Sequence, residues 1–221
     1  KLFTGLTTLA DTTPGGYTIT ANNWSACTLN NRHYLFQRNH EPLVYDANTS
    51  TLSSIATHPS VAGVAPDAHV CLAAYGRVWA ADTINDKKTL YWSDSLNGLD
   101  WSTGTSGSLD LTTVWPSGYD VITAVAAHNN LLIIFGKQNI LIYAGANDPT
   151  SMTLSDVVSN IGAVNRDAVV NTGKDIIFGD HSGIRSLGRT IQEKSSPIGD
   201  ISRNINFDIK NFLASDGDNL K

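Results

Sequence analysis

Short apolar runs alternate with short polar turns along most of the chain, and one arrangement occurs four times. Each copy has a strand of small residues, a polar turn and a more apolar strand, which is the pattern of a β-hairpin. The four opening strands are expected at residues 26–29, 70–73, 123–126 and 168–171. The pattern therefore predicts four hairpins of one design.

The spacing of these hairpins indicates the fold class. Cys27, Cys71, Ala124 and Val169 occupy equivalent positions and are separated by 44, 53 and 45 residues. A period of about 40–50 residues made only of strands is typical of β-propeller blades, because one such sheet needs stacked neighbours to bury its faces. An insertion over 102–120 explains the longer second interval. We expect an all-β fold: a β-propeller, or part of one, with about four blade-like antiparallel repeats.

A second hairpin follows each opening hairpin, and a polar outer strand is expected to complete each unit. The second turns contain residues that favour tight reversals; they lie at 39–42, 83–88, 136–139 and 179–183. The expected outer strands lie at 50–56, around Trp101, at 152–158 and at 190–194. Polar sequence at these positions suits the exposed edge of a sheet.

The C-terminal region has a different pattern. Ile205, Ile209 and Leu213 recur every four residues, which predicts a short helix over 201–214 with Ser202 or Asn204 as its cap. We expect a propeller-like domain over 1–200, with repeats near 24–60, 68–103, 121–158 and 166–195. Residues 201–221 would form a helix or linker leading to a region that is absent. Since position 1 is not Met, we expect an excised or processed piece of a longer polypeptide.

Composition and charge narrow the function classes. The 221 residues are 41% hydrophobic and 16% charged, which favours a packed globular protein over a disordered one. The net charge is −5 and no basic block is present, which argues against tight binding of nucleic acid. The longest strongly apolar run, 131–135, is far too short to predict a membrane span.

The two cysteines occur at the same position in successive repeats. We interpret Cys27 and Cys71 as small buried side chains on inner strands. Neighbouring blades are expected to hold them too far apart for the close approach that a disulfide needs. Two reduced thiols would indicate that the protein is made in a reducing compartment.

Motifs of common catalytic and metal sites are absent from the sequence. It has no nucleophile elbow, phosphate-binding loop, HExxH motif or CxxC pair. Six scattered histidines are interpreted as exposed turn residues rather than metal ligands; they are His33, His40, His58, His69, His128 and His181. We therefore predict no catalytic, cofactor-binding or metal-binding residue, no cofactor and no enzymatic activity.

One stretch supports an alternative. Residues 93–101 resemble the Asp-box of sialidase-type propellers, with Gly98 and Trp101 matching, but Leu96 and Asp100 replace the Asp and the Thr of that motif. Asp-boxes are structural, and the arginines here are too dispersed to suggest a site for a sugar carboxylate. Five tryptophans would suit a sugar-binding face, although core packing is favoured for two, Trp79 and Trp92. A secreted carbohydrate-binding or sialidase-like glycoside-active β-propeller is the alternative reading.

An ordered set of stretches resembles a family of bacteriophage tail proteins. The set consists of 76–80, 90–94, 100–101, 122–125, 134–143, 160–164, 175–180 and 183–185. In this order it is similar to the hub or nozzle proteins of short-tailed phages, which include packaged-DNA stabilisation proteins and tail tubular protein B. The resemblance spans about residues 70–200. Proteins of that family are longer, so it implies that this chain is their propeller-like part or a portion of it.

The resemblance implies a structural protein of the virion tail, made in the bacterial host cytoplasm. Such a protein assembles as a homo-oligomeric ring that forms or seals the channel for DNA ejection. Its partners would be other tail proteins, on the portal or adaptor side and on the fibre or needle side. Contact with passing DNA would be transient at most, since a mildly acidic wall repels phosphates.

Overall fold

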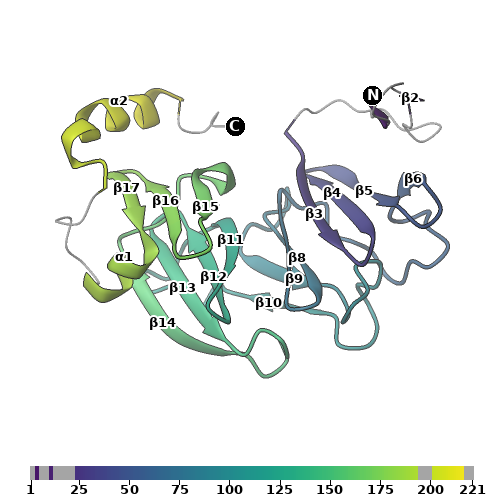
Figure 1. Ribbon diagram of the computed structural model, residues 1–221. Helices are drawn as coiled ribbons and strands as arrows, with labels where there is room; N and C mark the ends of the chain where they lie inside the picture. Colours follow the sequence, from purple (N-terminus) through teal and green to yellow (C-terminus); the bar gives the residue numbers. More distant parts are fainter. Residues whose placement is uncertain (1–2, 5–9, 12–22, 194–200, 217–221) are drawn as a thin grey trace. The chain divides into compact units, whose positions relative to one another are not determined.

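The computed structural model describes residues 3–4, 10–11, 23–193 and 201–216. Within these residues the chain is mostly β, and four antiparallel sheets follow one another in sequence order (Figure 1). A two-stranded pair of β1 (Phe3–Thr4) and β2 (Ala10–Asp11) precedes them. The predicted all-β class and the blade-like repeats are confirmed.

Each sheet is built from strands that are consecutive in the chain. The first contains β3 (Ser25–Leu29), β4 (Arg32–Gln37), β5 (His40–Asp46) and β6 (Thr51–Ser54). The second contains β7 (Val70–Ala74), β8 (Arg77–Ala81), β9 (Thr89–Trp92) and β10 (Gly107–Asp110). The third contains β11 (Ile122–His128), β12 (Leu131–Gly136), β13 (Asn139–Ala144) and β14 (Thr153–Ser159). The fourth contains β15 (Val169–Asn171), which follows a 3₁₀ turn η1 (Arg166–Ala168), then β16 (Ile176–Asp180) and β17 (Gly183–Ser186).

Three of the opening hairpins share one turn geometry, which explains the repeat seen in the sequence. Their two-residue loops have positive φ at both positions, as tight hairpins of the type I′ class require; they are Asn30–Asn31, Tyr75–Gly76 and Asn129–Asn130. Asn and Gly tolerate this backbone conformation better than other residues. The loops therefore set the register of the strands on either side.

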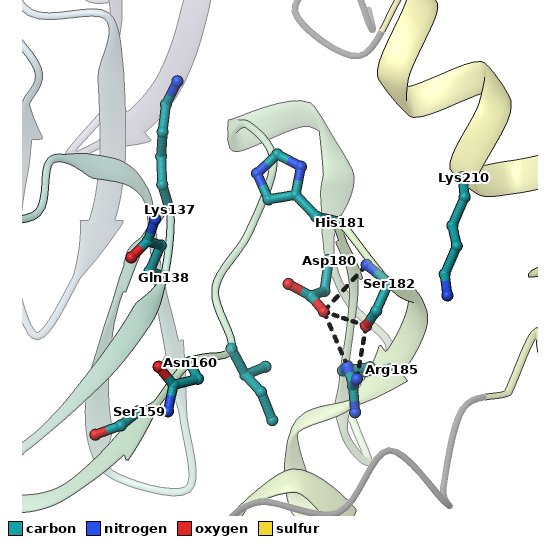
Figure 2. A pocket seen from close by; sticks show the side chains of 10 residues that line it. Lys137, Gln138, Ser159, Asn160, Asp180, His181, Ser182, Arg185 and Lys210 are labelled. Carbon is teal, nitrogen blue, oxygen red and sulfur yellow. Dashed lines mark hydrogen bonds and ion pairs between the residues drawn. The ribbon is translucent and has the colours of Figure 1, made fainter.

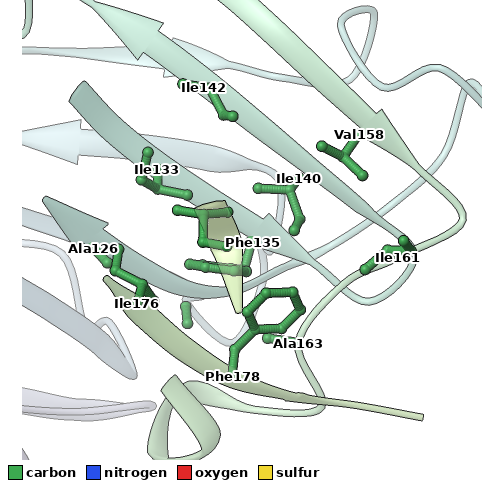
Figure 3. Packing of buried hydrophobic residues seen from close by; sticks show 12 residues of the cluster. Ala126, Ile133, Phe135, Ile140, Ile142, Val158, Ile161, Ala163, Ile176 and Phe178 are labelled. Carbon is green, nitrogen blue, oxygen red and sulfur yellow. The ribbon is translucent and has the colours of Figure 1, made fainter. Parts of the chain in front are cut away.

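The chain divides into two compact units. The first contains residues 1–86 and 90–109, and the second contains 87–89 and 110–221. Each unit has a hydrophobic core between two successive sheets. Tyr34 and Phe36 of the first sheet share a core with Val78 of the second. In the second unit, Phe135 of the third sheet packs against Phe178 of the fourth with ring centroids 5.2 Å apart (Figure 3).

Two of the four expected outer strands are wrong. The outer strand of the second sheet is β10 rather than the stretch around Trp101, because residues before it are held in loops by side-chain hydrogen bonds of Asp94 and Asp100. Residues 190–193 belong to helix α1 (Leu187–Glu193). Leu187 is 2% exposed and Ile191 packs on the same core, so the helix covers the sheet where a strand was expected.

The C-terminal helix is confirmed, with a different start. A 3₁₀ turn η3 (Arg203–Ile205) leads into α2 (Asn206–Asp216). Ser202 precedes the turn but makes no side-chain cap; its Oγ accepts a hydrogen bond of 2.8 Å from the backbone N–H of Ile184 instead. This contact ties the segment to β17. Within the described ranges, no helix is long and apolar enough to cross a membrane.

Both cysteines lie on inner strands of the first two sheets. Cys27 on β3 and Cys71 on β7 are half-buried and neither is in a disulfide, and the two strands lie side by side. Cys71 lies close enough to Cys27 to raise the pKa of the Cys27 thiol. The inner strands of the first two sheets pack directly together, so the strands that carry these two residues are neighbours.

Candidate functional site

A cavity in the second unit has a volume of about 680 Å³ (Figure 2). Several of its walls are turns between strands. Lys137 and Gln138 come from the β12–β13 turn, and His181 and Ser182 come from the β16–β17 turn. Its other lining residues are Ser159, Asn160, Ile161, Asp180, Arg185 and Lys210. The site is therefore built from ends of the third and fourth sheets and from α2.

A buried ion pair forms the wall nearest β17. The Nε of Arg185 lies 3.2 Å from Oδ2 of Asp180, and each residue is 6% exposed. The Oγ of Ser182 accepts a hydrogen bond of 2.6 Å from Arg185 and lies against the Asp180 carboxylate (Figure 2). A buried pair of this kind is stable only when further hydrogen bonds satisfy both ions, as they do here. The hydrogen bonds of these two charged side chains hold the β16–β17 turn in place.

The remaining charge in the cavity is positive. Lys137 and Lys210 are exposed at its rim, and Asp180 is the one acid among the described residues that line it. Hydrolysis of a glycosidic bond ordinarily uses two facing carboxylates. A cavity with one carboxylate, already paired with Arg185, lacks that arrangement. Its chemistry suits a weakly held anion better than acid–base catalysis.

Asp120 fixes the turn that carries Lys137 and Gln138. One carboxylate oxygen accepts a hydrogen bond of 2.9 Å from the N–H of Lys137. The other accepts bonds of 3.0 Å from the N–H of Gln138 and 2.8 Å from the side-chain amide of Asn139. The local sequence pattern does not indicate this role, because Asp120 lies 17 residues before Lys137, ahead of a different strand. The only feature of the sequence that could have indicated this role is the residue type, because Asp side chains often accept hydrogen bonds from the backbone N–H groups of turns.

The Asp-box-like stretch is a second candidate site, and its carboxylates are committed to a loop. Asp94 accepts hydrogen bonds of 2.8 and 2.9 Å from the backbone and hydroxyl of Thr105, and the backbone bond is the main cause of its lowered pKa. Burial opposes ionisation of Asp100, but hydrogen bonds from Thr103 and Ser102 lower its pKa. Trp101 donates to the Gly98 carbonyl at 3.0 Å and packs edge-on against Phe36.

The arginines do not gather at one place within the described chain. Arg32 pairs with Asp46, Arg38 with Asp82, and Arg166 with Asp167, each at a different position. Arg77 is buried and donates to the carbonyls of Ser93 and Thr105 at 2.9 and 3.3 Å. These contacts provide no shared site for a sugar carboxylate.

The tryptophans and histidines, the other candidate site residues of the sequence, do not form a site either. Trp79, Trp92 and Trp115 are buried, so they cannot line an open sugar-binding face. His33, His40 and His128 lie on strands rather than in turns, whereas His181 lies in the β16–β17 turn. In the part of the chain that the structure describes, no three side chains of His, Cys, Asp or Glu are grouped to hold a metal ion.

No protein-family model and no curated protein sequence matches the chain. The resemblance to phage tail proteins therefore depends on the ordered stretches themselves. In the structure these stretches are mainly paired strands and their turns. Residues 76–80 and 90–94 lie on or beside β8 and β9. Residues 134–143 span the end of β12 and most of β13, and 175–180 and 183–185 fall on β16 and β17.

Proposed function

We propose that this chain is a structural, non-enzymatic component of a phage tail, of the hub or nozzle type. The observation that carries the proposal is that five of the eight resembling stretches fall on the second and third strands of three successive sheets. A set of motifs that recurs at one structural position in each repeat favours a common scaffold role. In this proposal the chain forms or seals a DNA channel and supports neighbouring tail proteins.

The hydrogen bonds made by the buried polar side chains support a structural role for the chain. Arg77, Asp120 and the Asp180–Arg185 pair each hold a loop or a turn through several hydrogen bonds. Buried charges at catalytic sites are ordinarily aimed at a substrate cavity. Asp180 and Arg185 also line the cavity, but they are paired with each other, and all of these bonds connect strands and loops of the same unit.

Helix α2 offers a surface for assembly. Phe207 is 76% exposed and Phe212 is 50% exposed, and Ile201 and Ile205 just before them are also exposed. Several large apolar side chains on one short segment favour contact with another protein. We place contacts with other copies of the chain, or with tail proteins on the portal or fibre side, on this segment.

Assembly is tested by light scattering of the full chain after size-exclusion chromatography. We expect a ring-sized oligomer, and we expect Phe207→Glu to weaken it at least tenfold because a charge at an apolar contact must be desolvated. Leu154→Glu is the matched control, since Leu154 is 41% exposed on the outer strand β14 and its replacement should leave assembly unchanged. A strict monomer that binds or cleaves glycans would contradict the proposal and favour the carbohydrate-active alternative.

The proposed channel wall should not hold DNA. With a net charge of −5, the chain lacks the phosphate-neutralising surface on which most nucleic-acid affinity depends. Titration with duplex DNA at low salt should give binding weaker than micromolar. Submicromolar binding that falls steeply as salt is added would refute a wall that DNA passes without adhering.

A further inference from the structure

The two cysteines of the first unit lie on β3 and β7, inner strands of neighbouring sheets that are in contact. Ser25 and Cys27 are two residues apart on β3, so their side chains lie on the same face of that strand. The Oγ of Ser25 lies 3.1 Å from Sγ of Cys71 and accepts a bond of 3.3 Å from the Cys71 N–H. The face of β3 that carries Cys27 is thus turned toward Cys71 on β7.

Both side chains are half-buried and neither belongs to a disulfide. Partial exposure lets a small reagent approach, while the packed strands keep the second thiol within reach of the first. We propose that Cys27 and Cys71 form a reversible disulfide when the protein meets a low-molecular-weight disulfide. The bond would join the inner strands of the first two sheets, and it is independent of the proposed tail function.

The reaction is two successive thiol–disulfide exchanges. The thiolate of one cysteine attacks the small disulfide, so that a mixed disulfide forms and one small thiolate leaves. The thiolate of the second cysteine then attacks the protein sulfur of the mixed disulfide and expels the other small thiolate. The two cysteines lose two electrons to the small disulfide, and the two thiol protons end on the two small thiols.

The local environment sets the pH dependence of this reaction. The hydrogen bond to Cys71, together with burial, raises the pKa of the Cys27 thiol. Only the thiolate is nucleophilic, so the cross-link forms slowly at neutral pH. Its rate should continue to rise at pH values where an exposed thiol, with a pKa of about 8.5, is already ionised.

The cross-link should stabilise the first unit. It would close the segment between the first two inner strands and restrict the unfolded chain, which is the main source of disulfide stabilisation in the chain-entropy account. We expect the melting temperature of the oxidised protein to rise by roughly 10 °C relative to the reduced protein.

The test is incubation of the native full chain with oxidised glutathione at pH 8, followed by blocking of free thiols with iodoacetamide and measurement of the intact mass. We expect a monomer that has lost two hydrogen atoms, takes up no iodoacetamide and yields a peptide containing Cys27 joined to Cys71. Dithiothreitol should restore both the original mass and the lower melting temperature.

Single variants separate the cross-link from adventitious oxidation. Cys27→Ser and Cys71→Ser should each give only a mixed disulfide with glutathione at the remaining thiol, with no gain in melting temperature. Ser25→Ala keeps both thiols and should still form the cross-link. If the wild-type chain instead carries glutathione on both thiols, stays fully reduced or forms only disulfide-linked dimers, the proposal is wrong.

Discussion

At the scale of single residues, carboxylates in this protein are used mainly to hold loops. Asp46 ends β5 and receives a hydrogen bond of 2.8 Å from Nε of Arg32 and one of 2.9 Å from the N–H of Asn48. The hydrogen bond from Arg32 is the main cause that lowers the pKa of Asp46 to about 2, against the opposing effect of burial. The ionised form is therefore the one that stabilises the fold.

The Arg32–Asp46 pair should make the stability of the protein depend on pH. Because the folded pKa is lower than the unfolded one, the contribution of Asp46 is complete above about pH 4 and is lost as the pH falls toward 2. Asp46→Asn should cost about 1 kcal/mol of unfolding free energy at pH 7. In urea titrations, the difference from the wild type should shrink between pH 4 and pH 2. A difference that stays constant, or one that survives in an Arg32→Gln background, would contradict the assignment.

Gly162 provides a second test at this scale. A Cβ placed on Gly162 would overlap the backbone carbonyls of Gly136 and Lys137, which cannot move without displacing the β12–β13 turn. Gly162→Ala should destabilise the protein by about 3 kcal/mol in denaturant titrations. Gly188→Ala is the matched control: it lies in α1, its Cβ would only touch the Asp175 carboxylate at 3.5 Å, and alanine favours helices. Equal losses in both variants would rule out the proposed overlap.

At the scale of elements, the sequence predicts the hairpins because their determinants are local. The Asn30–Asn31 and Asn129–Asn130 loops carry the positive φ values that the turns need, and alternating small and apolar residues flank them. The helix near the C-terminus is predicted for the same reason, since its apolar period is contained in one segment. Residues within a few positions of each other determine these elements.

Elements that depend on distant partners are predicted poorly. The segment 187–193 is short and mixed in character, and it becomes a helix because Leu187 and Ile191 find an apolar surface on the fourth sheet. The Trp101 segment stays in a loop because Asp94 and Asp100 accept hydrogen bonds from residues that follow it. Neither partner can be identified from the segment's own pattern.

The candidate cavity shows the same limit. Its rim turns, 136–139 and 179–183, are predicted from their residue types, but their meeting around Asp180 and Arg185 depends on the packing of the third sheet on the fourth. The contact of Cys27 with Cys71 is likewise a property of two sheets. The repeat period shows that Cys27 and Cys71 occupy equivalent positions in two repeats, but it does not show how far apart they lie in space.

At the scale of the whole molecule, the chain consists of two compact units, each with a core shared by two successive sheets. Pairing of sheets explains why a sequence with many polar turns buries apolar side chains so completely. Repeated units of this kind supply rigidity and surface. Both properties suit the proposed tail component, for which the exposed apolar residues of α2 are the proposed assembly surface.

Electron microscopy of the purified full chain tests the central claim, that the protein is a structural part of a ring. We predict ring-shaped particles with a central opening, which are lost in Phe207→Glu and retained in Leu154→Glu. Separate monomers at every concentration, in a preparation that binds or hydrolyses glycans, would contradict it.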